Sequence, residues 1–314
     1  MARTSFPMGP VRVRAGISKE VEIPITRLVT GADVSLPVQV VHGREDGPVV
    51  WVNAAIHGDE VAGVEVIRRV LSVLSAKTLR GTVLAVPVVN VLGFMAGDRY
   101  LPDRRDLNRS FPGSRRGSLA GRIAHLFMHE VVDKCSVGID LHTGADRRTN
   151  LPQIRADLDD SQTLRLAEAF GAPVMLHAKL RDGSLRQAAR DRGATVLLYE
   201  GGEAWRFDDF AIDAGVAGVL RVLASLDMIG PVPVADRKSV ACSESSWVRA
   251  RGTGVLQWEV ELGERVETGQ RLGGLSDTFG RRVRLVHADR TGIVVGLNRA
   301  PLVNSGDALV HLAR

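Results

Sequence analysis

The fold is decided by one stretch of the chain, Val49-Val50-Trp51-Val52-Asn53-Ala54-Ala55-Ile56-His57-Gly58-Asp59-Glu60. Its first half is apolar and rich in β-branched residues, which predicts a buried strand. A histidine, a glycine and two acids follow, and a helical pattern begins at Val61. In open α/β sheets, ligands bind beyond the carboxyl ends of the strands. This junction is therefore the first place to look for a functional site.

The junction after this strand has two interpretations. An imidazole and a carboxylate spaced like those of His57 and Glu60 can converge on one metal ion. Alternatively, Asp59 and Glu60 are ordinary first-turn residues of a helix, and His57 is a loop residue. The rest of the chain favours the metal site, because further potential ligands follow other predicted strands.

Length and composition indicate a globular protein. The chain has 314 residues, of which 45% are hydrophobic and 25% are charged, enough for a sizeable core and two domains. No apolar run could span a bilayer, and the first residues lack the apolar centre of a secretory signal, so we expect a cytoplasmic protein. The two cysteines, Cys135 and Cys242, cannot form a disulfide framework, which agrees with a reducing compartment.

The charge pattern indicates small anionic partners. A net charge of +5 and a pI near 9.7 would suit nucleic acid. However, aromatic residues make up only 4% of the chain and no basic run exceeds two residues, so we expect neither nucleic acid nor a membrane surface as partner. Arginine supplies nearly all the positive charge, which suits forked recognition of carboxylates, although coding bias would produce the same composition.

Apolar runs of strand length alternate with helical patterns over the first 230 residues. We expect strands at 21–25, 34–41, 49–56, 82–89, 137–141, 173–176 and 195–199, and helices at 61–75, 118–134, 161–170, 184–192 and 207–228. This alternation predicts an α/β fold with a mostly parallel, doubly wound sheet. Residues 95–113 form a long charged loop, and such loops are usually functional.

The pattern changes after a Pro- and Gly-containing linker at 229–233. From residue 240 onward, short β segments with glycine turns form two similar halves, which predicts a small all-β sandwich or half-barrel. We therefore divide the chain into domains at 1–230 and 239–314. The second domain resembles biotinyl/lipoyl carriers, but it has no lysine after Lys238 for attachment. We therefore expect the second domain to act as a lid, as a scaffold or as a contact in a homo-oligomer.

Three predicted strands end in groups that bind divalent metals. The strand at 137–141 is followed by His142, and the strand at 195–199 is followed by Glu200. Catalytic zinc takes three nitrogen or oxygen ligands plus water, and two of the ligands are commonly close in sequence while the third is distant. His57, Glu60 and His142 fit this rule. Cobalt and manganese can share such ligands, so the pattern leaves the metal open.

Two further acids near these ligands are candidates for supporting roles. Glu200 is suited to act as the general base that deprotonates a metal-bound water and then protonates the leaving amine. A strand-end acid that caps the next turn is the alternative, and Glu203 competes for the role of base. Asp140 lies on the same strand face as His142 and could orient it, or it could be a buried acid satisfied by backbone donors.

The charged loop offers groups that would bind a carboxylate substrate. Asn108 and Arg109 provide an amide and a forked guanidinium that suit an α-carboxylate. Arg99 could neutralise the oxyanion that forms when water attacks a carbonyl group. The loop therefore predicts both substrate binding and electrostatic stabilisation of the reaction.

The other charges of this loop leave its interpretation open. Arg104 or Arg105 could take the role of Arg99, although we expect both to be solvated or paired with Asp103 and Asp106. A loop that serves only as an ion-pair network has the same composition. Spacing alone does not separate these interpretations.

Four ordered motifs give the chain a family resemblance. They are His57-Gly58-Asp59-Glu60, Asp106-Leu107-Asn108-Arg109 with Phe111-Pro112-Gly113, Asp140-Leu141-His142 and Tyr199-Glu200. Together they resemble the succinylglutamate desuccinylase/aspartoacylase family, which is similar to zinc carboxypeptidases. The resemblance covers roughly residues 20–314, because the C-terminal β domain also fits.

The resemblance implies roles for seven residues. One zinc ion per subunit would be held by His57, Glu60 and His142, with Asn108 and Arg109 binding the carboxylate, Arg99 polarising the carbonyl and Glu200 moving the proton. The implied activity is a zinc-dependent deacylase that cleaves the amide bond of an N-acyl amino acid or related small carboxylate. A metallocarboxypeptidase acting on peptide C-termini would use the same ligands, and a non-catalytic zinc-binding scaffold would keep the fold. A C-terminal domain packed over the entrance favours the small substrate, whereas an open groove favours a peptide.

Overall fold

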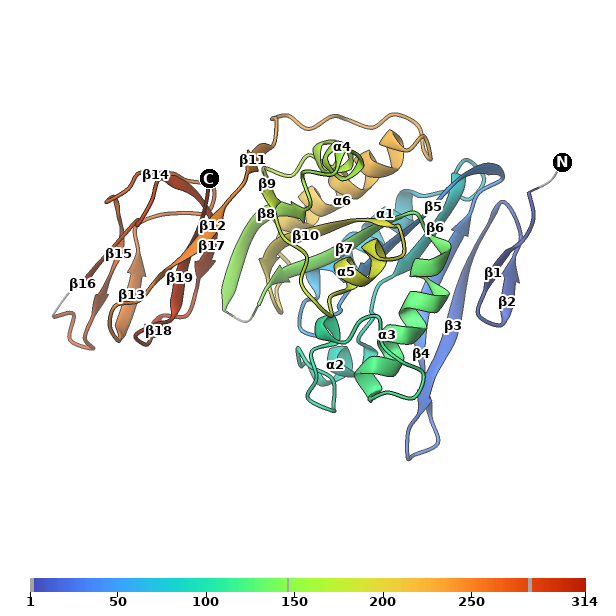
Figure 1. Ribbon diagram of the computed structural model, residues 1–314, viewed down its shortest axis with the longest axis horizontal. Helices are drawn as coiled ribbons and strands as arrows, with labels where there is room; N and C mark the ends of the chain where they lie inside the picture. The colour runs from blue at the N-terminus through green and yellow to red at the C-terminus, as the bar shows by residue number, and fades with distance from the viewer. Residues whose placement is uncertain (1–2, 146, 282–283) are drawn as a thin grey trace.

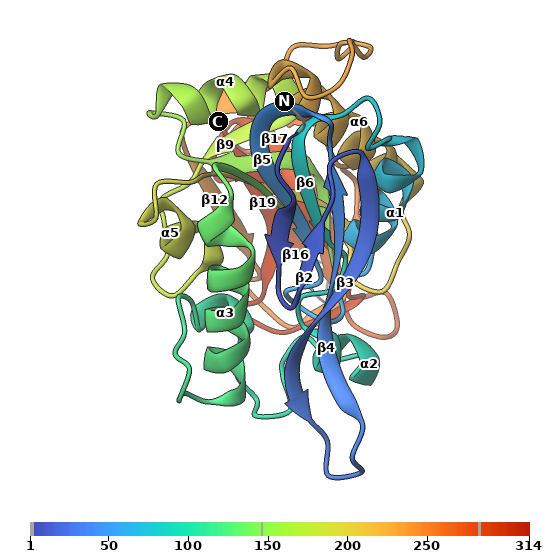
Figure 2. The ribbon, with the colours of Figure 1, turned by 90° about the vertical axis from the view of Figure 1, so that its right-hand side faces the viewer.

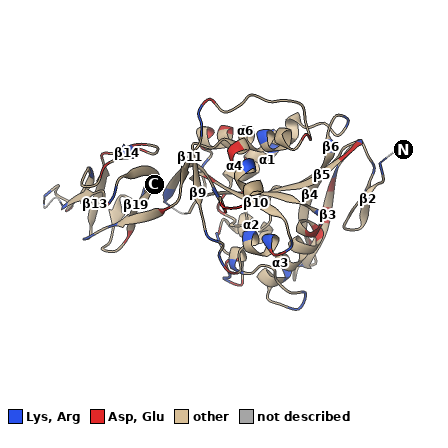
Figure 3. Cartoon of the chain, turned by 45° about the horizontal axis from the view of Figure 1, so that its top comes forward, with Lys and Arg blue, Asp and Glu red and all other residues tan. Residues whose placement is uncertain are grey.

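The structure is a computed structural model that describes residues 3–145, 147–281 and 284–314. Figure 1 shows an α/β part that holds the N-terminal strands, the helices and the central sheet, with an all-β part beside it at the C-terminal end of the chain. None of the helices in the described ranges is both long and apolar enough to cross a membrane. In Figure 3, Lys and Arg are spread over both parts and are mixed with acidic residues.

The α/β part contains the elements that the alternation predicts, together with several that it does not. Its strands are β1 (Phe6–Met8), β2 (Val11–Val13), β3 (Ile17–Arg27), β4 (Asp33–His42), β5 (Glu45–Ala54), β6 (Arg80–Val86), β7 (Val137–Gly144), β8 (Arg148–Ala156), β9 (Val174–His177) and β10 (Thr195–Glu203). Its helices are α1 (Ala62–Val73), α2 (Val91–Ala96), η1 (Leu107–Arg109), α3 (Leu119–Glu130), η2 (Val132–Lys134), α4 (Ser161–Phe170), α5 (Leu185–Arg190) and α6 (Asp209–Ser225). The hairpin β1–β2, the strand β8 and the helix α2 were not predicted.

The large sheet is parallel only at its centre. Its order runs β3-β4-β6-β5-β7-β10-β8, and the four central strands β6, β5, β7 and β10 are parallel to one another. On one side β4 pairs antiparallel with β6 and β3, and on the other β8 pairs antiparallel with β10. The connections β3–β4 and β7–β8 are too short for a parallel crossover, so these strands reverse direction. The sheet is therefore mixed, rather than mostly parallel throughout.

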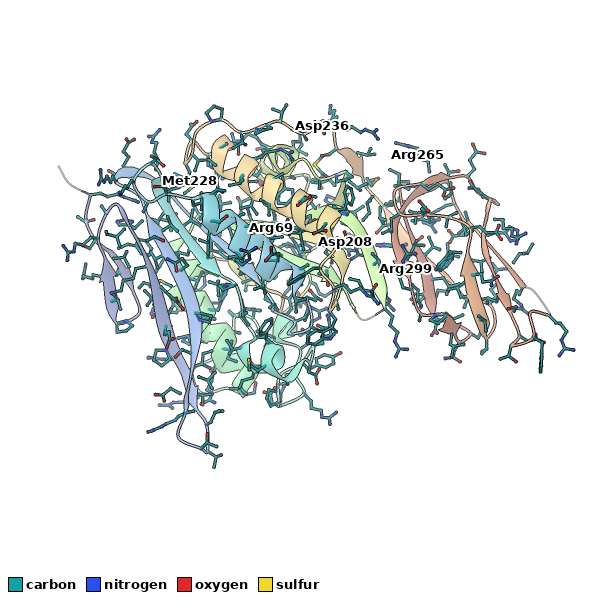
Figure 4. All side chains as sticks on the ribbon, turned by 180° about the vertical axis from the view of Figure 1, so that it is seen from behind. Arg69, Asp208, Met228, Asp236, Arg265 and Arg299 are labelled. Atoms are coloured by element: carbon teal, nitrogen blue, oxygen red, sulfur yellow. The ribbon has the colours of Figure 1, made fainter. Side chains whose placement is uncertain are left out.

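Helices cover both faces of the sheet, as predicted. Figure 2 shows α3 and α5 on one side and α1 and α6 on the other, where α4 also packs. Arg69, labelled in Figure 4, links α1 to α6 through Asp213, with its Nη1 2.9 Å from Asp213 Oδ1.

Within the sheet, fully buried Trp51 of β5 lies over Gly138 of β7, where a Cβ atom would be 2.0 Å from the indole ring. Only glycine fits beside this tryptophan.

The C-terminal part is all-β, as predicted. Its strands are β11 (Val240–Cys242), β12 (Ser245–Arg249), β13 (Gly254–Trp258), β14 (Arg265–Val266), β15 (Arg271–Ser276), β16 (Arg284–His287), β17 (Gly292–Asn298), β18 (Leu302–Val303) and β19 (Ala308–Ala313). One antiparallel sheet has the order β16-β15-β13-β18. The strands β12, β19, β17 and β14 are also antiparallel, and β17 pairs with β8. The central sheet thus continues into the C-terminal part through β8 and β17.

Candidate functional site

The predicted ligands meet because their strands are parallel neighbours. His57 and Glu60 follow β5, His142 lies near the end of β7, and Glu200 of β10 is in register with His142. The carboxyl ends of parallel strands open at the same edge of a sheet, where ligands bind in α/β proteins. Three segments far apart in the sequence therefore supply one cluster of polar side chains.

The turn between β5 and α1 is unusually tight. Ala55 has a positive φ of 49°, a conformation that costs free energy for a residue other than glycine. At Gly58 a Cβ atom would be 2.2 Å from the carbonyl carbon of Gly93, so this position needs glycine. The backbone N–H of Trp205 donates to the carbonyl of Asp59 at 2.9 Å and holds the turn from the other side. The turn brings the side chains of His57 and Glu60 together.

Glu60 lies between the two histidines. Its Oε1 is 2.8 Å from His57 Nδ1, and its Oε2 is 2.7 Å from His142 Nδ1. The backbone N–H of Thr143 also donates to Oε2 at 3.2 Å. All three side chains are at least 94% buried. We call His57, Glu60 and His142 the triad.

Burial and mutual charge shift the pKa values of the triad in opposite directions. Burial opposes the charge of Glu60, but the two imidazoles outweigh it and hold the pKa of this carboxyl well below its usual range. Burial also opposes the charge of the histidines. Nevertheless, Glu60 raises the pKa of His57, and Asp140 with Glu60 raises the pKa of His142 well above its usual value. Without a metal ion, the triad behaves as a buried cluster of ion pairs.

In each histidine of the triad, the ring nitrogen that does not contact Glu60 faces an acid. We call this atom, Nε2, the outer nitrogen. Asp106 Oδ1 lies 3.3 Å from His57 Nε2, and Asp140 Oδ2 lies 3.0 Å from His142 Nε2. Asn53 Nδ2 donates to the other oxygen of Asp140 at 2.6 Å. Asp140 is thus bound by side chains in the described part of the chain, which agrees with the predicted orienting role. Arg105 pairs with Asp103, as expected, whereas Asp106 faces His57 and lies 3.9 Å from Nη2 of Arg99.

The donor set of the triad fits a divalent metal ion. Ligand atoms of the three residues all lie within 4.8 Å of one another. Histidines that bind metals usually donate their second ring N–H to a carboxylate, and both imidazoles here have such a partner. A second group of possible ligands, Asp157, Asp159 and His177, is more exposed. The triad is the better buried of the two groups.

Arg99 is the loop arginine that contacts the triad. Its Nη1 donates to Glu60 Oε1 at 2.9 Å, and its Nη2 is 3.0 Å from His57 Nε2. Arg105 instead lies 3.8 Å from Asp103, and neither Arg104 nor Arg105 lines the cavity beside the triad. The geometry therefore places Arg99, rather than its alternatives, next to the candidate metal site.

A cavity of about 330 Å³ opens at the triad and is strongly basic. Asn108, Glu200, Asn150 and Trp247 are among its lining residues. Its basic residues are Arg99, Arg109, Arg148, Arg155, Lys179, Arg181 and Arg186, whereas the acids that line it in the described ranges are Glu60 and Glu200. This balance favours an anionic ligand.

The predicted carboxylate-binding pair lies in the wall of this cavity. Asn108 is buried, and its Oδ1 accepts from the backbone N–H of Leu185 at 2.9 Å, so its amide group has a fixed orientation. Arg109 Nη1 donates to the carbonyl oxygen of Asn108 at 2.5 Å. Burial lowers the pKa of Arg109. The group remains a cation, because a guanidinium does not lose its proton in proteins. Both residues are in position to meet a ligand.

Glu200 lines the cavity, and Glu203 does not. The Oε2 atom of Glu200 accepts a short hydrogen bond from Asn150 Nδ2, and its Oε1 lies 3.4 Å from Arg155 Nε. Glu203 accepts from Thr149 Oγ1 at 2.9 Å and lines a different cavity. Of the two candidates for the base, the geometry places Glu200 on the side of the triad.

Several lining residues were missed from the sequence, among them two on β8 and one in the C-terminal part. Asn150 and Arg155 lie on β8, and Trp247 lies on β12 of the C-terminal part. Residues 148–156 hold a proline, Pro152, which argues against a strand inside a sheet and conceals β8. Trp247 stacks on His311 at 4.7 Å between ring centroids, and the guanidinium of Arg148 lies 5.1 Å from its ring. No local pattern places this tryptophan beside the triad.

Fold and site define a class of protein: an α/β protein with a candidate metal site at the carboxyl ends of parallel strands. A family model for the succinylglutamate desuccinylase/aspartoacylase catalytic domain matches residues 46–226. The chain belongs to this family. The matched range contains all three residues of the triad and Glu200.

Curated and solved relatives agree with this family over nearly the whole chain. The chain is 30% identical over 294 residues to the N-alpha-acetyl-L-2,4-diaminobutyric acid deacetylase of Halomonas elongata, covering 89% of this chain and 86% of the relative. A succinylglutamate desuccinylase/aspartoacylase from Rhodobacter sphaeroides is 26% identical, with a TM-score of 0.83 and 95% of each chain covered. The fold also resembles the product-bound ectoine utilization protein EutE (DoeB) from Ruegeria pomeroyi, at 24% identity, a TM-score of 0.86 and coverage of 99% and 98%.

Proposed function

We propose that this protein is a zinc-dependent hydrolase that cleaves the amide bond of an N-acyl amino acid or a related small carboxylate. The observation that carries the proposal is the triad, whose ligand atoms face one another while Asp106 and Asp140 hold the outer ring nitrogens. The names of the relatives, a deacetylase and desuccinylases, support the same reaction class.

In the proposed mechanism, one zinc ion would be held by His57, Glu60 and His142. The bound ion would act as a Lewis acid and lower the pKa of a water molecule. Glu200 takes the proton of the attacking water and delivers it to the nitrogen of the leaving amine. Asn150 and Arg155 limit the positions open to the Glu200 carboxylate, since each lies against one of its oxygens.

The loop residues bind the substrate and stabilise its developing charge. The guanidinium of Arg99 donates to the carbonyl oxygen as it becomes negative. Asn108 and Arg109 bind the α-carboxylate of the amino acid, because an amide and a guanidinium are both hydrogen-bond donors to carboxylate. The α-carboxylate then fixes the amide bond relative to the triad.

A metallocarboxypeptidase that acts on peptide C-termini is the alternative, and the shape of the cavity favours the smaller substrate. We propose that residues 1–230 form the catalytic domain and that residues 239–314 form a second domain that closes one side of the cavity. Trp247 supports this division, since it belongs to β12 and lines the cavity of about 330 Å³. The carboxypeptidase-like detail of the fold, a cytoplasmic location and a homo-oligomer stay predictions.

A substrate panel tests the proposal. The zinc-loaded protein and a chelated control are given N-acetyl, N-formyl and N-succinyl amino acids and short peptides, and the free amine is measured. We expect zinc-dependent hydrolysis of N-acyl amino acids and slower cleavage of peptides. Preferred cleavage of peptides would establish the carboxypeptidase. No hydrolysis of any substrate by protein with one equivalent of bound zinc would favour a non-catalytic scaffold.

A further inference from the structure

We propose that Trp205 is a positioning residue for Arg99: its indole ring holds the loop from which the Arg99 guanidinium reaches the triad. The inference rests on the proposed function, in which Arg99 donates to the carbonyl oxygen of the substrate as it becomes negative. It names a further residue on which that step depends. Trp205 follows β10 and is outside the described lining of the cavity, so it acts through Arg99 rather than on the substrate.

Trp205 has a backbone conformation that a tryptophan rarely adopts. Its φ is +62°, in the left-handed region that favours glycine, where a bulky side chain is an outlier. Such a strained conformation persists only where the surrounding contacts hold it, and residues of this kind concentrate at functional sites. The contacts that hold Trp205 in place therefore indicate what it does.

The backbone at Trp205 joins the two chain segments that carry the triad. The N–H of Ala204 donates at 3.1 Å to the carbonyl of Gly144, the last residue of β7. The N–H of Trp205 donates at 2.9 Å to the carbonyl of Asp59, in the turn after β5. Any residue except proline can donate such backbone hydrogen bonds. They fix the path of the chain, but the reason for a tryptophan at this position lies in the contacts of its side chain.

The indole ring of Trp205 lies against the start of the loop that carries Arg99. Gly97 ends α2 with a φ of +68°, and a Cβ atom there would be 2.8 Å from Cζ2 and 3.0 Å from Cη2 of the ring. The ring therefore rests directly on the backbone of Gly97, two residues before Arg99, and only glycine leaves room for it. Trp205 is 53% exposed, so burial in a core does not account for this contact.

The same segment of the loop also contacts the turn that carries the triad. A Cβ atom at Gly58 would be 2.4 Å from the carbonyl oxygen of Asp98, and the N–H of Gly58 donates to the carbonyl of Arg99 at 3.4 Å. Residues 97–99 are thus in contact with both the turn and the indole ring. From this position Arg99 Nη1 donates to Glu60 Oε1 at 2.9 Å. Loss of the indole ring would remove one of the two contacts and allow the guanidinium to shift.

Substitution by glycine tests the indole ring without disturbing the backbone. Trp205→Gly keeps the N–H that donates to Asp59 and adopts a positive φ freely, so Tm should stay within about 5 °C of the wild-type value. One zinc ion per chain should still bind, because the triad is intact. The kcat/KM for the preferred N-acyl amino acid should fall about 10- to 100-fold, chiefly through kcat, because small displacements of a catalytic group are costly. Trp205→Phe retains a smaller ring and should recover part of the loss.

A double-mutant cycle assigns the loss to Arg99. In an Arg99→Met background, Trp205→Gly should lower kcat/KM by less than about 2-fold, because the group that Trp205 positions is already absent. Phe207→Gly is the matched control, since Phe207 is 64% exposed in the same loop and outside the described lining of the cavity, and it should stay within about 2-fold of the wild type. An equal loss in both backgrounds, wild-type kcat/KM in Trp205→Gly, or loss of its bound zinc would overturn the inference.

Amide hydrogen exchange separates this inference from the proposed function, because it needs neither metal nor turnover. The N–H groups of Gly97 and Asp98 donate to carbonyls of α2 at 3.2 and 2.9 Å. In the metal-free protein, a peptide covering residues 93–101 should exchange about 5-fold faster or more in Trp205→Gly and at the wild-type rate in Phe207→Gly. Faster exchange would support the inference even if the panel showed no hydrolysis. Unchanged exchange would refute it even if N-acyl amino acids were hydrolysed.

Discussion

Two walls of the same cavity differ in how their polar groups are satisfied. On the triad wall, both ring nitrogens of His57 and of His142 face a carboxylate, and both oxygens of Glu60 face an imidazole. On the wall formed by β8 and α5, Arg155 Nε and Arg186 Nη1 are buried without a hydrogen bond in the described ranges. The polar groups of the first wall are paired with one another, whereas the second wall has two guanidinium nitrogens that remain available as hydrogen-bond donors. We therefore assign metal binding to the first wall, and to the second the positioning of Glu200 and hydrogen-bond donors for a substrate.

The largest effect is expected from removing a member of the triad. His142→Ala deletes one of three proposed ligands, so zinc binding and hydrolysis should both fall below detection, because zinc supplies the activated water. Zinc content after dialysis and turnover of the preferred substrate measure the two effects. A His142→Ala protein that keeps one zinc ion and near wild-type turnover would show that the triad is not the metal site.

A smaller loss should follow from changing the proposed base. Glu200→Gln preserves the shape of the side chain but cannot accept the proton, so kcat should fall by about 10²–10⁴-fold while zinc content is unchanged. Glu203→Gln is the matched control and should stay within about 2-fold, as for a substitution outside the site. If the two variants exchanged these behaviours, Glu203 would be the base.

The two acids that face the outer nitrogens of the histidines, Asp106 and Asp140, should strengthen metal binding. Asp106→Asn and Asp140→Asn each remove a carboxylate from an outer ring nitrogen, and each should weaken zinc binding about 10- to 100-fold. Competition with a chromogenic chelator gives the affinities. Asp103→Asn is a fitting control, since Asp103 belongs to the same loop and pairs with Arg105. Unchanged affinity in both variants would mean that these acids serve the fold alone.

The pH dependence of stability should be reversed by zinc. In the metal-free protein the pKa values of His57 and His142 are raised, so their contribution is complete below about pH 6.5 and is lost as pH rises through the folded values. The pKa of Glu60 is lowered, so its contribution is present above about pH 4.3 and is lost in acid. Tm should therefore fall above about pH 6.5 without metal.

Bound zinc requires neutral imidazoles, so it should stabilise the protein more as pH rises. Thermal unfolding between pH 5 and 9, with zinc and with chelator, tests the sign of both trends. A metal-free Tm that rises steadily through this range would contradict the ion-pair cluster of the triad.

The two walls also differ in how far they could be predicted from the sequence. His57, Glu60 and His142 could be found because each follows an apolar strand, and the ends of parallel strands must meet. Asn150 and Arg155 could not, because Pro152 conceals β8 and because a short connection, rather than a helical crossover, returns the chain beside β10. Trp247 comes from a segment whose position depends on the pairing of β17 with β8, which has no local signal.

The orientation of individual side chains could not be predicted from the sequence either. Asp106 and Arg105 are neighbours in one charged loop, but the 3-10 turn that follows Asp106 directs this acid to His57. Residue type and spacing predicted that the loop serves the site. The partner of each charge depends on backbone geometry, which spacing does not specify.

The most direct test of the account is to locate the metal in zinc-loaded protein by anomalous X-ray diffraction. The account predicts one zinc ion per chain, held by a nitrogen of His57, a nitrogen of His142 and the carboxylate of Glu60 at about 2.0–2.2 Å, with a position open to solvent. Zinc bound instead at Asp157, Asp159 and His177, or absent from the triad at full loading, would contradict it.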